Sequence, residues 1–518
     1  MNCSPVDLTV IIMYLIGMRV IALYVSQSER SLEGYLFAGR ALNGWVAGLS
    51  LAGTSISSVT FLAYPADAFK ATWLRLLPCF MLPLAIFLMA RWWLKSVRGI
   101  KRVTAYELLE ERYGVGVRVY GALVFVISQL IRVSVILYLI SLVTAHLIGL
   151  DAWLCVLITG ALVAAYTTRG GLSAVVWTDV VQVITLAVGG SLCLWWVIDL
   201  TPGGSATLIT HALRDQKVSF AEMSQIGVGE SDWTLSLTRK TALMMLIVGL
   251  THWLTEYLSG QSALQRLYST RSLKEARRAL WVCVALSLPL WILFMTLGTA
   301  LYGLFIERTD VVAEAISRGA LPAESLIPHF ITHYLPSGLA GFVIAAALAA
   351  AMSSLDSALN AIASVVTYDL YHPLHDLKHK FSRLKREDVM RSRSKHAPSP
   401  RFARRVTTIT ALCMICGALF CLDTERETLR DSLISLSALL SGGLLCLYLF
   451  ALSKIQVSAR DVWFGLSLAG LSTLWFAAAS QSLVLSPIDP YYAALIGNLS
   501  LLIGVIVSRA HRVYSRGS

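Results

Sequence analysis

The sequence predicts an all-α membrane protein that crosses the bilayer about thirteen times. Of its 518 residues, 56% are hydrophobic and only 14% are charged, and the mean hydropathy is +0.67. Soluble proteins carry roughly 25% charged residues, so this composition is typical of a polytopic membrane protein. The apolar residues also gather in stretches of about 20 residues, the length that crosses roughly 30 Å of hydrocarbon.

The apolar stretches divide the chain into four parts. We expect an extra N-terminal helix in 1–40, a first unit of five spans in 41–200, a second unit in 201–455 and two helices in 456–518. Counted from zero, the predicted spans lie near residues 5–26, 41–67, 73–94, 117–148, 151–168, 174–198, 241–262, 279–304, 337–369, 405–422, 429–453, 459–480 and 488–509.

The net charge of +12 predicts an orientation in the membrane and no nucleic-acid partner. Eleven Lys and Arg lie between Lys378 and Arg405, within a basic loop at 372–405. Cytoplasmic loops are enriched in these residues, and with the N-terminus outside roughly 30 of the 43 basic residues fall on the cytoplasmic side. We therefore expect a multi-pass protein of the cell inner membrane, embedded in lipid, with a cytoplasmic C-terminus.

Spans one to five form one unit and spans six to ten form another. Each unit has an odd number of spans, so the second unit begins on the opposite side of the membrane from the first. This is the inverted-repeat plan of many secondary transporters. In the middle of span one, residues 53–60 form a polar, β-branched segment with one glycine. Unwound backbone at membrane depth is tolerated where it lines a cavity. The alternative is a continuous helix whose hydroxyls bond to their own carbonyls.

Span eight combines small apolar residues with a polar cluster. Hydroxyls and a carboxylate are costly in a membrane helix unless they face a partner or a cavity. Oxygen ligands suit hard cations, so the cluster favours ion-coupled transport, against the alternative of small-residue packing with one stray acid. The cluster consists of Ser353, Ser354, Asp356, Ser357 and Asn360.

Three further spans carry ionisable residues. Asp179 in span five is a candidate cation ligand or proton relay, or an acid that is solvated near the interface. Arg132, deep in span three, needs an anion: a solute carboxylate, or a structural pair with Asp179 or Asp356. His252 and Glu256 share one helix face in span six, either as a proton relay or as a hydrogen-bonded polar pair near a cavity.

At several of these residues the chain resembles the sodium/solute symporter family. The matching stretches are Gly39-Arg40, 53–60, 104–114, 166–179, Gln265-Arg266 and 345–371. They occur in order over most of the chain. The resemblance implies a LeuT-type five-plus-five inverted repeat, with one extra N-terminal helix and two C-terminal helices.

The resemblance also implies ion sites. A shared sodium site would use the carbonyls of Gly53, Ile56 and Ala350 with the hydroxyls of Ser353 and Ser354. A second sodium site, which some members have, would fall at Asp179, Ser353, Asp356 and Ser357. Asp356 stands where the sialic acid carriers of the family have serine, which leaves the number of ions open.

Within the family the bacterial carriers of sialic acid are the most similar, which implies solute contacts from Ser55, Ser57, Thr60 and Arg132, with Cys79 on span two. Cys79 and Arg75 depart from the expected glutamine and aromatic residue, so the glycerol or N-acyl end of the solute is expected to differ. We expect a sodium-driven symporter of a small anionic sugar-like solute, sialic acid or a relative, with no enzyme activity and no obligate protein partner. The alternatives are a neutral sugar, polyol or amino acid as solute, proton coupling, a channel or sensor, and a membrane-embedded enzyme.

Overall fold

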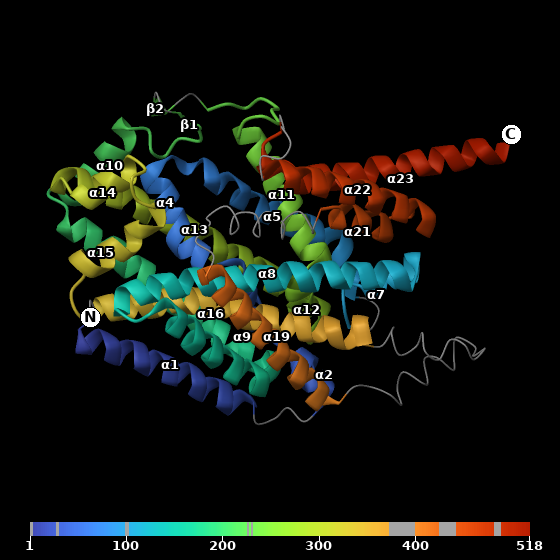
Figure 1. The fold of residues 1–518 in the computed structure, drawn as a ribbon, viewed down its shortest axis with the longest axis horizontal. Helices are drawn as coiled ribbons and strands as arrows, with labels where there is room; N and C mark the ends of the chain where they lie inside the picture. The colour runs from blue at the N-terminus through green and yellow to red at the C-terminus, as the bar shows by residue number, and fades with distance from the viewer. Residues whose placement is uncertain are drawn as a thin grey trace.

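The computed structural model describes residues 4–26, 31–98, 103–224, 227–228, 231–371, 399–423, 442–480 and 488–517. These residues are almost entirely helical (Figure 1). A single small hairpin of β1 (Met223–Ser224) and β2 (Gly227–Val228) lies in the described part of the loop before α11. Residues 372–398 of the predicted basic loop and most of the predicted span at 429–453 lie outside the described residues.

The long helices run side by side and form the body of the molecule (Figure 1). Their bounds are α1 Pro5–Ser26, α8 Val115–Ile148, α9 Ala152–Leu200, α11 Ala242–Ser259, α13 Leu273–Arg308, α16 Leu339–Val365, α19 Pro400–Asp423, α22 Ala459–Ser480 and α23 Ala493–Gly517. Shorter helices are α2 Leu32–Phe37, α3 Gly44–Ser55, α4 Ser58–Lys70, α5 Leu82–Leu88, α6 Leu94–Arg98, α7 Glu107–Tyr113, α10 Gly204–Arg214, α12 Gln261–Tyr268, α14 Val311–Ser317, α15 Leu326–Tyr334 and α21 Leu444–Leu452.

The described residues contain 10 helices that are long and apolar enough to span a membrane, or 11 with the bent pair α3–α4. Helix α9 has 49 residues, too long for one crossing, and the backbone breaks at Gly171, where φ is 58°. It therefore contains both spans predicted at 151–168 and 174–198. The two termini lie at opposite ends of the bundle (Figure 1).

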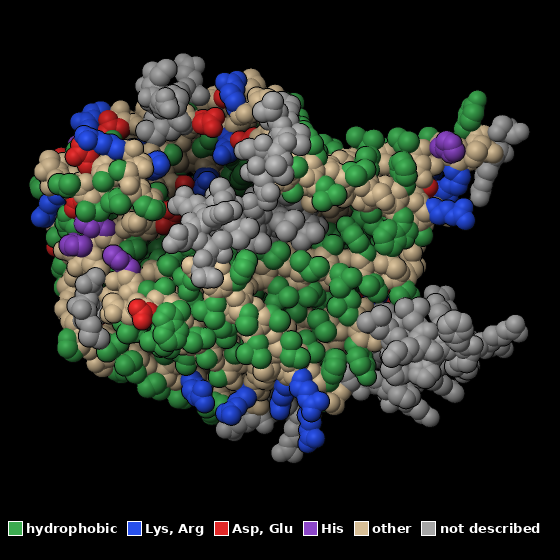
Figure 2. All heavy atoms as spheres, viewed as in Figure 1, with side chains coloured by type: hydrophobic (Ala, Val, Ile, Leu, Met, Phe, Trp, Pro, Cys, Tyr) green, Lys and Arg blue, Asp and Glu red, His purple; other side chains and the backbone are tan. Residues whose placement is uncertain are grey.

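The surface agrees with a lipid environment. Large hydrophobic side chains are exposed along α1, for example Met13, Ile16 and Val20. Hydrophobic side chains cover the middle of the face shown in Figure 2, whereas acidic and histidine side chains gather mostly toward one end. An apolar surface of this extent would be unstable in water, and a bilayer removes that cost.

The first span of each unit is broken. Helix α3 ends at Ser55, Ile56 takes an extended conformation, and α4 begins at Ser58. In the second unit α11 ends at Ser259, Gly260 is extended, and α12 continues to Tyr268. The break in span one thus lies at 53–60, where the sequence predicts it. Span six, the first span of the second unit, was expected to end near 262 without a break.

Helix α16 lies at the centre of this arrangement, and almost all of its residues are buried. It packs against α9, α8, α1 and α19. Its run of alanines lets the neighbouring backbones approach closely, as small residues do between membrane helices. The polar residues of α16 are therefore held in the protein interior, where they must find partners or ligands.

Span two differs from a regular helix. Residues Trp73–Met81 form a 3-10 helix, and a π-helical turn at Met89–Trp93 separates α5 from α6. Pro78 lies inside the 3-10 segment and has no N–H to donate to a regular helix. Its backbone packs closely against Gly249 of α11, where an added Cβ would lie 2.4 Å from Pro78 Cα.

Candidate functional site

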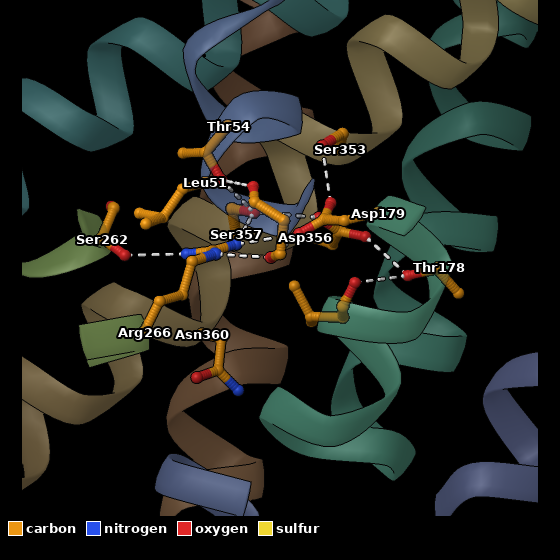
Figure 3. Close-up of polar contacts among 12 residues, drawn as sticks. Leu51, Thr54, Thr178, Asp179, Ser262, Arg266, Ser353, Asp356, Ser357 and Asn360 are labelled. Atoms are coloured by element: carbon orange, nitrogen blue, oxygen red, sulfur yellow. Dashed lines mark hydrogen bonds and ion pairs between the residues drawn. The ribbon is translucent and has the colours of Figure 1, made fainter. Parts of the chain in front are cut away.

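A buried ion pair joins the second broken helix to α9. Arg266 of α12 donates from Nη2 to Asp179 Oδ2 at 3.0 Å, and both side chains are 0% exposed. The Arg266 Nε donates to Ser50 Oγ of α3 at 2.6 Å, and Nη1 donates to the Ser262 carbonyl at 2.8 Å. Ser50 in turn donates to the Asp179 carboxylate. This network holds α3, α9 and α12 together (Figure 3).

Helix α16 supplies the other side of the cluster. Ser353 Oγ donates to Asp179 Oδ1 at 2.5 Å, and Ser357 Oγ accepts from Arg266 Nη2 at 2.5 Å. Thr54 Oγ1 lies 3.2 Å from Ser357 Oγ, so the break in span one also reaches this group. The cluster thus joins both broken helices to α9 and α16 (Figure 3).

Asp356 is fully buried, and three hydroxyl groups of described residues donate to its carboxylate. Its Oδ2 accepts from the Tyr166 hydroxyl at 2.7 Å and from Thr178 Oγ1 at 3.5 Å, and its Oδ1 accepts from Ser357 Oγ at 3.4 Å. It forms no ion pair with any residue that the structure describes. Asp179 and Asp356 are neighbouring carboxylates. Because the guanidinium of Arg266 is bonded to Asp179, the carboxylate of Asp356 is left without a bonded cation. A buried carboxylate in this position suits a bound cation.

The hydroxyls predicted for the shared sodium site lie where α16 approaches the end of α3. A Cβ added to Gly53 would lie 2.8 Å from Ser353 Oγ and 2.9 Å from Val183 Cγ2, so only glycine fits this approach. Ser354 Oγ is buried and has no hydrogen-bond partner among the described residues. The extended backbone at Ile56 and the unpartnered hydroxyl of Ser354 both offer oxygen atoms, the ligands that a hard cation prefers.

A small cavity of about 40 Å³ lies beside this cluster. Helices from both units line it, and its polar side includes the predicted residues Ser55 and Arg132 together with His252 and Glu256. Arg132 and His252 are exposed although they belong to spanning helices, and both line this space. The full lining is Leu51, Thr54, Ser55, Arg132, His252, Trp253, Glu256, Tyr257 and Ala263.

The other predicted solute contacts do not line this cavity. Ser57 and Thr60 are buried at the start of α4. Cys79 Sγ lies 3.2 Å from the Tyr64 hydroxyl. Arg75 forms an ion pair with Asp67 at 2.7 Å, and its side chain is half exposed. These residues lie in or against α4, the second half of the first broken helix, and do not line the cavity in this conformation.

One residue that the sequence left without a role, Arg266, is central to the site. The alternative that Arg132 pairs with Asp179 is wrong, because Arg266 takes that place. Arg266 lies in α12, beyond the end of the span predicted at 241–262. The one available signal was its place in the Gln265-Arg266 stretch, where Gln265 also donates to Asn360 Oδ1 at 2.7 Å.

The model of the sodium:solute symporter family matches residues 35–391. The chain belongs to this family. It is 26% identical over 502 residues to the sodium/sialic acid symporter SiaT of Proteus mirabilis, covering 96% of this chain and 93% of that protein. It is 25% identical over 491 residues to the sodium/sialic acid symporter NanT of Aliivibrio fischeri, covering 95% and 90%.

A solved structure of a Na⁺-coupled sialic acid symporter, in a substrate-bound outward-open state, is similar over 98% of both chains. The TM-score is 0.82 at 25% identity. The chain therefore has the LeuT-type fold that the resemblance implied. As a member of the symporter family it is a sodium-coupled, multi-pass membrane transporter and not an enzyme.

Proposed function

We propose that this symporter uses the sodium gradient to import a small anionic sugar-like solute of the sialic acid class. Two relatives and the similar solved structure, each similar over most of this chain, are sialic acid symporters. The observation that carries the ion assignment is the buried hydroxyl of Ser354, which has no partner among the described residues and follows Ser353, whose Oγ lies close to Gly53 at the end of α3. The first sodium ion would bind there, with carbonyls of Gly53, Ile56 and Ala350.

A second sodium ion is proposed at the two carboxylates. Asp356 and Ser357 would supply most of this site, because Arg266 and the hydroxyls of Ser50 and Ser353 already bind Asp179. A cation beside Asp356 would relieve the repulsion between two neighbouring buried carboxylates. Movement of Arg266 would then change ion binding at this site, since Arg266 contacts both Asp179 and Ser357.

Arg132 is the proposed partner of the solute carboxylate. Its guanidinium lines the cavity and makes no hydrogen bond or ion pair with a described residue, so it can bind an acid through two parallel hydrogen bonds. Ser55 in the same lining could add a hydrogen bond. A cavity of 40 Å³ is far below the roughly 300 Å³ of typical ligand sites, so the helices must separate to admit the solute.

Coupling follows from shared elements. The break between α3 and α4 lies at the proposed first sodium site, and Leu51, Thr54 and Ser55 before it line the cavity. An ion that fixes this break pre-organises the cavity, and by linkage the solute must strengthen ion binding by the same factor. We further propose that the protein lies in the inner membrane with its N-terminus outside and its C-terminus in the cytoplasm, as the basic residues predict.

The test is uptake of N-acetylneuraminic acid into proteoliposomes with and without an inward sodium gradient. We expect uptake only with the gradient, and a strongly weakened sodium dependence in the double variant Ser353→Ala/Ser354→Ala. Ser191→Ala is the matched control, because this α9 hydroxyl only bonds the Ala187 carbonyl of its own helix. Uptake that is independent of sodium, or unchanged sodium affinity in the double variant, would reject the assignment.

A further inference from the structure

Two side chains of opposite charge line the same cavity without pairing. Arg132 of α8 and Glu256 of α11 both belong to the lining, yet they form no ion pair with each other and no side-chain hydrogen bond with any described residue. They are near enough to interact electrostatically. His252, one turn before Glu256 on the same helix, also lines the cavity and has no described hydrogen-bond partner. Unpaired charges in such a site are costly until a ligand satisfies them.

A solute with a carboxylate alone satisfies only half of this arrangement. Its carboxylate would bind Arg132, but the carboxylate of Glu256 would stay unpaired and would repel it. A solute that also carries an ammonium group would satisfy both charges and keep the cavity neutral. The nearby guanidinium of Arg266 is not free to pair with Glu256, since it bonds Asp179, Ser50, Ser357 and the Ser262 carbonyl.

The aromatic lining supports the same conclusion by a different interaction. Trp253 and Tyr257 lie beside Glu256 on α11 and line the cavity with it. Aromatic side chains attract ammonium groups through the negative charge on their faces. Helix α11 therefore contributes both a carboxylate and aromatic side chains to the lining, which favour a cationic group, whereas α8 contributes a guanidinium.

We propose that the preferred solute is zwitterionic, an acidic sugar with a free amino group, whose carboxylate binds Arg132 and whose ammonium group binds Glu256. The inference rests on the proposed function and deepens it, because it specifies the chemistry of the same site. Glu256 then determines specificity: it selects the free amine and disfavours the N-acylated form, which carries no positive charge.

The test compares two ligands that differ only at this nitrogen: the methyl glycoside of neuraminic acid, which has a free amino group, and the methyl glycoside of N-acetylneuraminic acid. Calorimetry on the purified protein in saturating sodium measures both affinities. We expect the amine to bind tighter by roughly ten- to a hundredfold, the range of a hydrogen bond to a charged group. Glu256→Gln should abolish this preference. Glu314→Gln should keep it, because Glu314 pairs with Arg318 at the surface.

The wild-type comparison does not depend on folding of a variant. Equal or tighter binding of the N-acetyl glycoside by the wild type would overturn the inference and leave the proposed function intact. A preference that persists in Glu256→Gln would overturn the role of Glu256. Binding of neither glycoside would overturn the solute class of the proposed function, and this inference with it.

Discussion

Arg266 and Asp179 form an ion pair in which neither side chain has any exposed surface, with Nη2 and Oδ2 3.0 Å apart. The pair joins the second half of one broken helix to a helix of the other unit. A buried pair of this kind adds little to stability relative to apolar residues, but removing one partner leaves an uncompensated charge. The arrangement thus positions three hydroxyls: Ser50 contacts both members of the pair, Ser353 contacts Asp179 and Ser357 contacts Arg266.

The first prediction concerns this pair. Arg266→Gln or Asp179→Asn alone should lower the free energy of unfolding by about 3–5 kcal/mol, because each leaves a buried charge without its partner. The double variant should lose less than the sum of the two, since neither charge remains. Thermal unfolding of the purified protein in detergent measures the three variants against the wild type. Additive losses would show that the two residues act independently.

The second prediction concerns the number of sodium ions. Asp356→Asn removes the charge of the carboxylate that has no bonded cation while keeping hydrogen-bonding atoms for Tyr166 and Thr178. We expect a lower Hill slope of transport against sodium concentration, or a weaker apparent sodium affinity, with the fold retained. Sodium titration of solute uptake measures both quantities. If slope and affinity match the wild type, Asp356 is structural and one ion suffices.

The third prediction concerns a loop lysine outside the spanning helices. Lys217 is 3% exposed, donates to the Phe69 carbonyl at 2.8 Å and lies 4.0 Å from the centre of the Tyr302 ring. Burial lowers its pKa to about 8, although the nearby Asp215 carboxylate opposes this shift. The folded state therefore binds this proton more weakly than the unfolded state, whose pKa is 10.5.

The direction in which stability changes with pH follows from proton linkage. Below pH 8 both states are protonated, and burying the charge costs stability on the order of 3 kcal/mol. Between pH 8 and 10.5 the unfolded state holds more of the proton, so stability rises with pH in this window. Melting temperatures of wild type and Lys217→Met should thus shift in favour of the wild type as pH rises. Lys70→Met, at an exposed site, is the control and should show no pH-dependent difference from the wild type. An equal pH dependence in Lys70→Met would show that burial of Lys217 is not the cause.

The sequence predicts the fold well because lipid imposes strong constraints on it. Apolar stretches such as 459–480 coincide with helix α22, and the polar segment at 53–60 contains the break after α3. Both features are local: length and polarity suffice to indicate them. The repeat plan was less certain from counting alone, and the similarity to a solved symporter structure supports it.

The partners within the site could not be predicted in the same way. Arg266 and Asp179 are 87 positions apart, and their pairing depends on how three helices pack. The half-helix α12 is polar and lies mostly beyond the predicted span at 241–262, and the break at Gly260 carries no strong local signal. The empty space beside Arg132 likewise depends on tertiary packing, which is why Glu256 was not assigned to the solute from the sequence.

The last prediction concerns the guanidinium of Arg132. Arg132→Lys keeps the positive charge but loses the planar fork that binds a carboxylate through two hydrogen bonds. Binding of N-acetylneuraminic acid should weaken by about 1–3 kcal/mol. Its carboxamide analogue should bind the wild type more weakly than the acid does and should be almost unaffected by the substitution. Calorimetry in saturating sodium measures both ligands, and Arg19→Lys on α1, at an exposed site outside the cavity lining, is the control. Folding should survive, because Arg132 makes no hydrogen bond or ion pair with a described residue. Equal affinity of the wild type for acid and carboxamide would instead show that Arg132 does not bind the carboxylate, and would favour a neutral sugar or polyol as the solute.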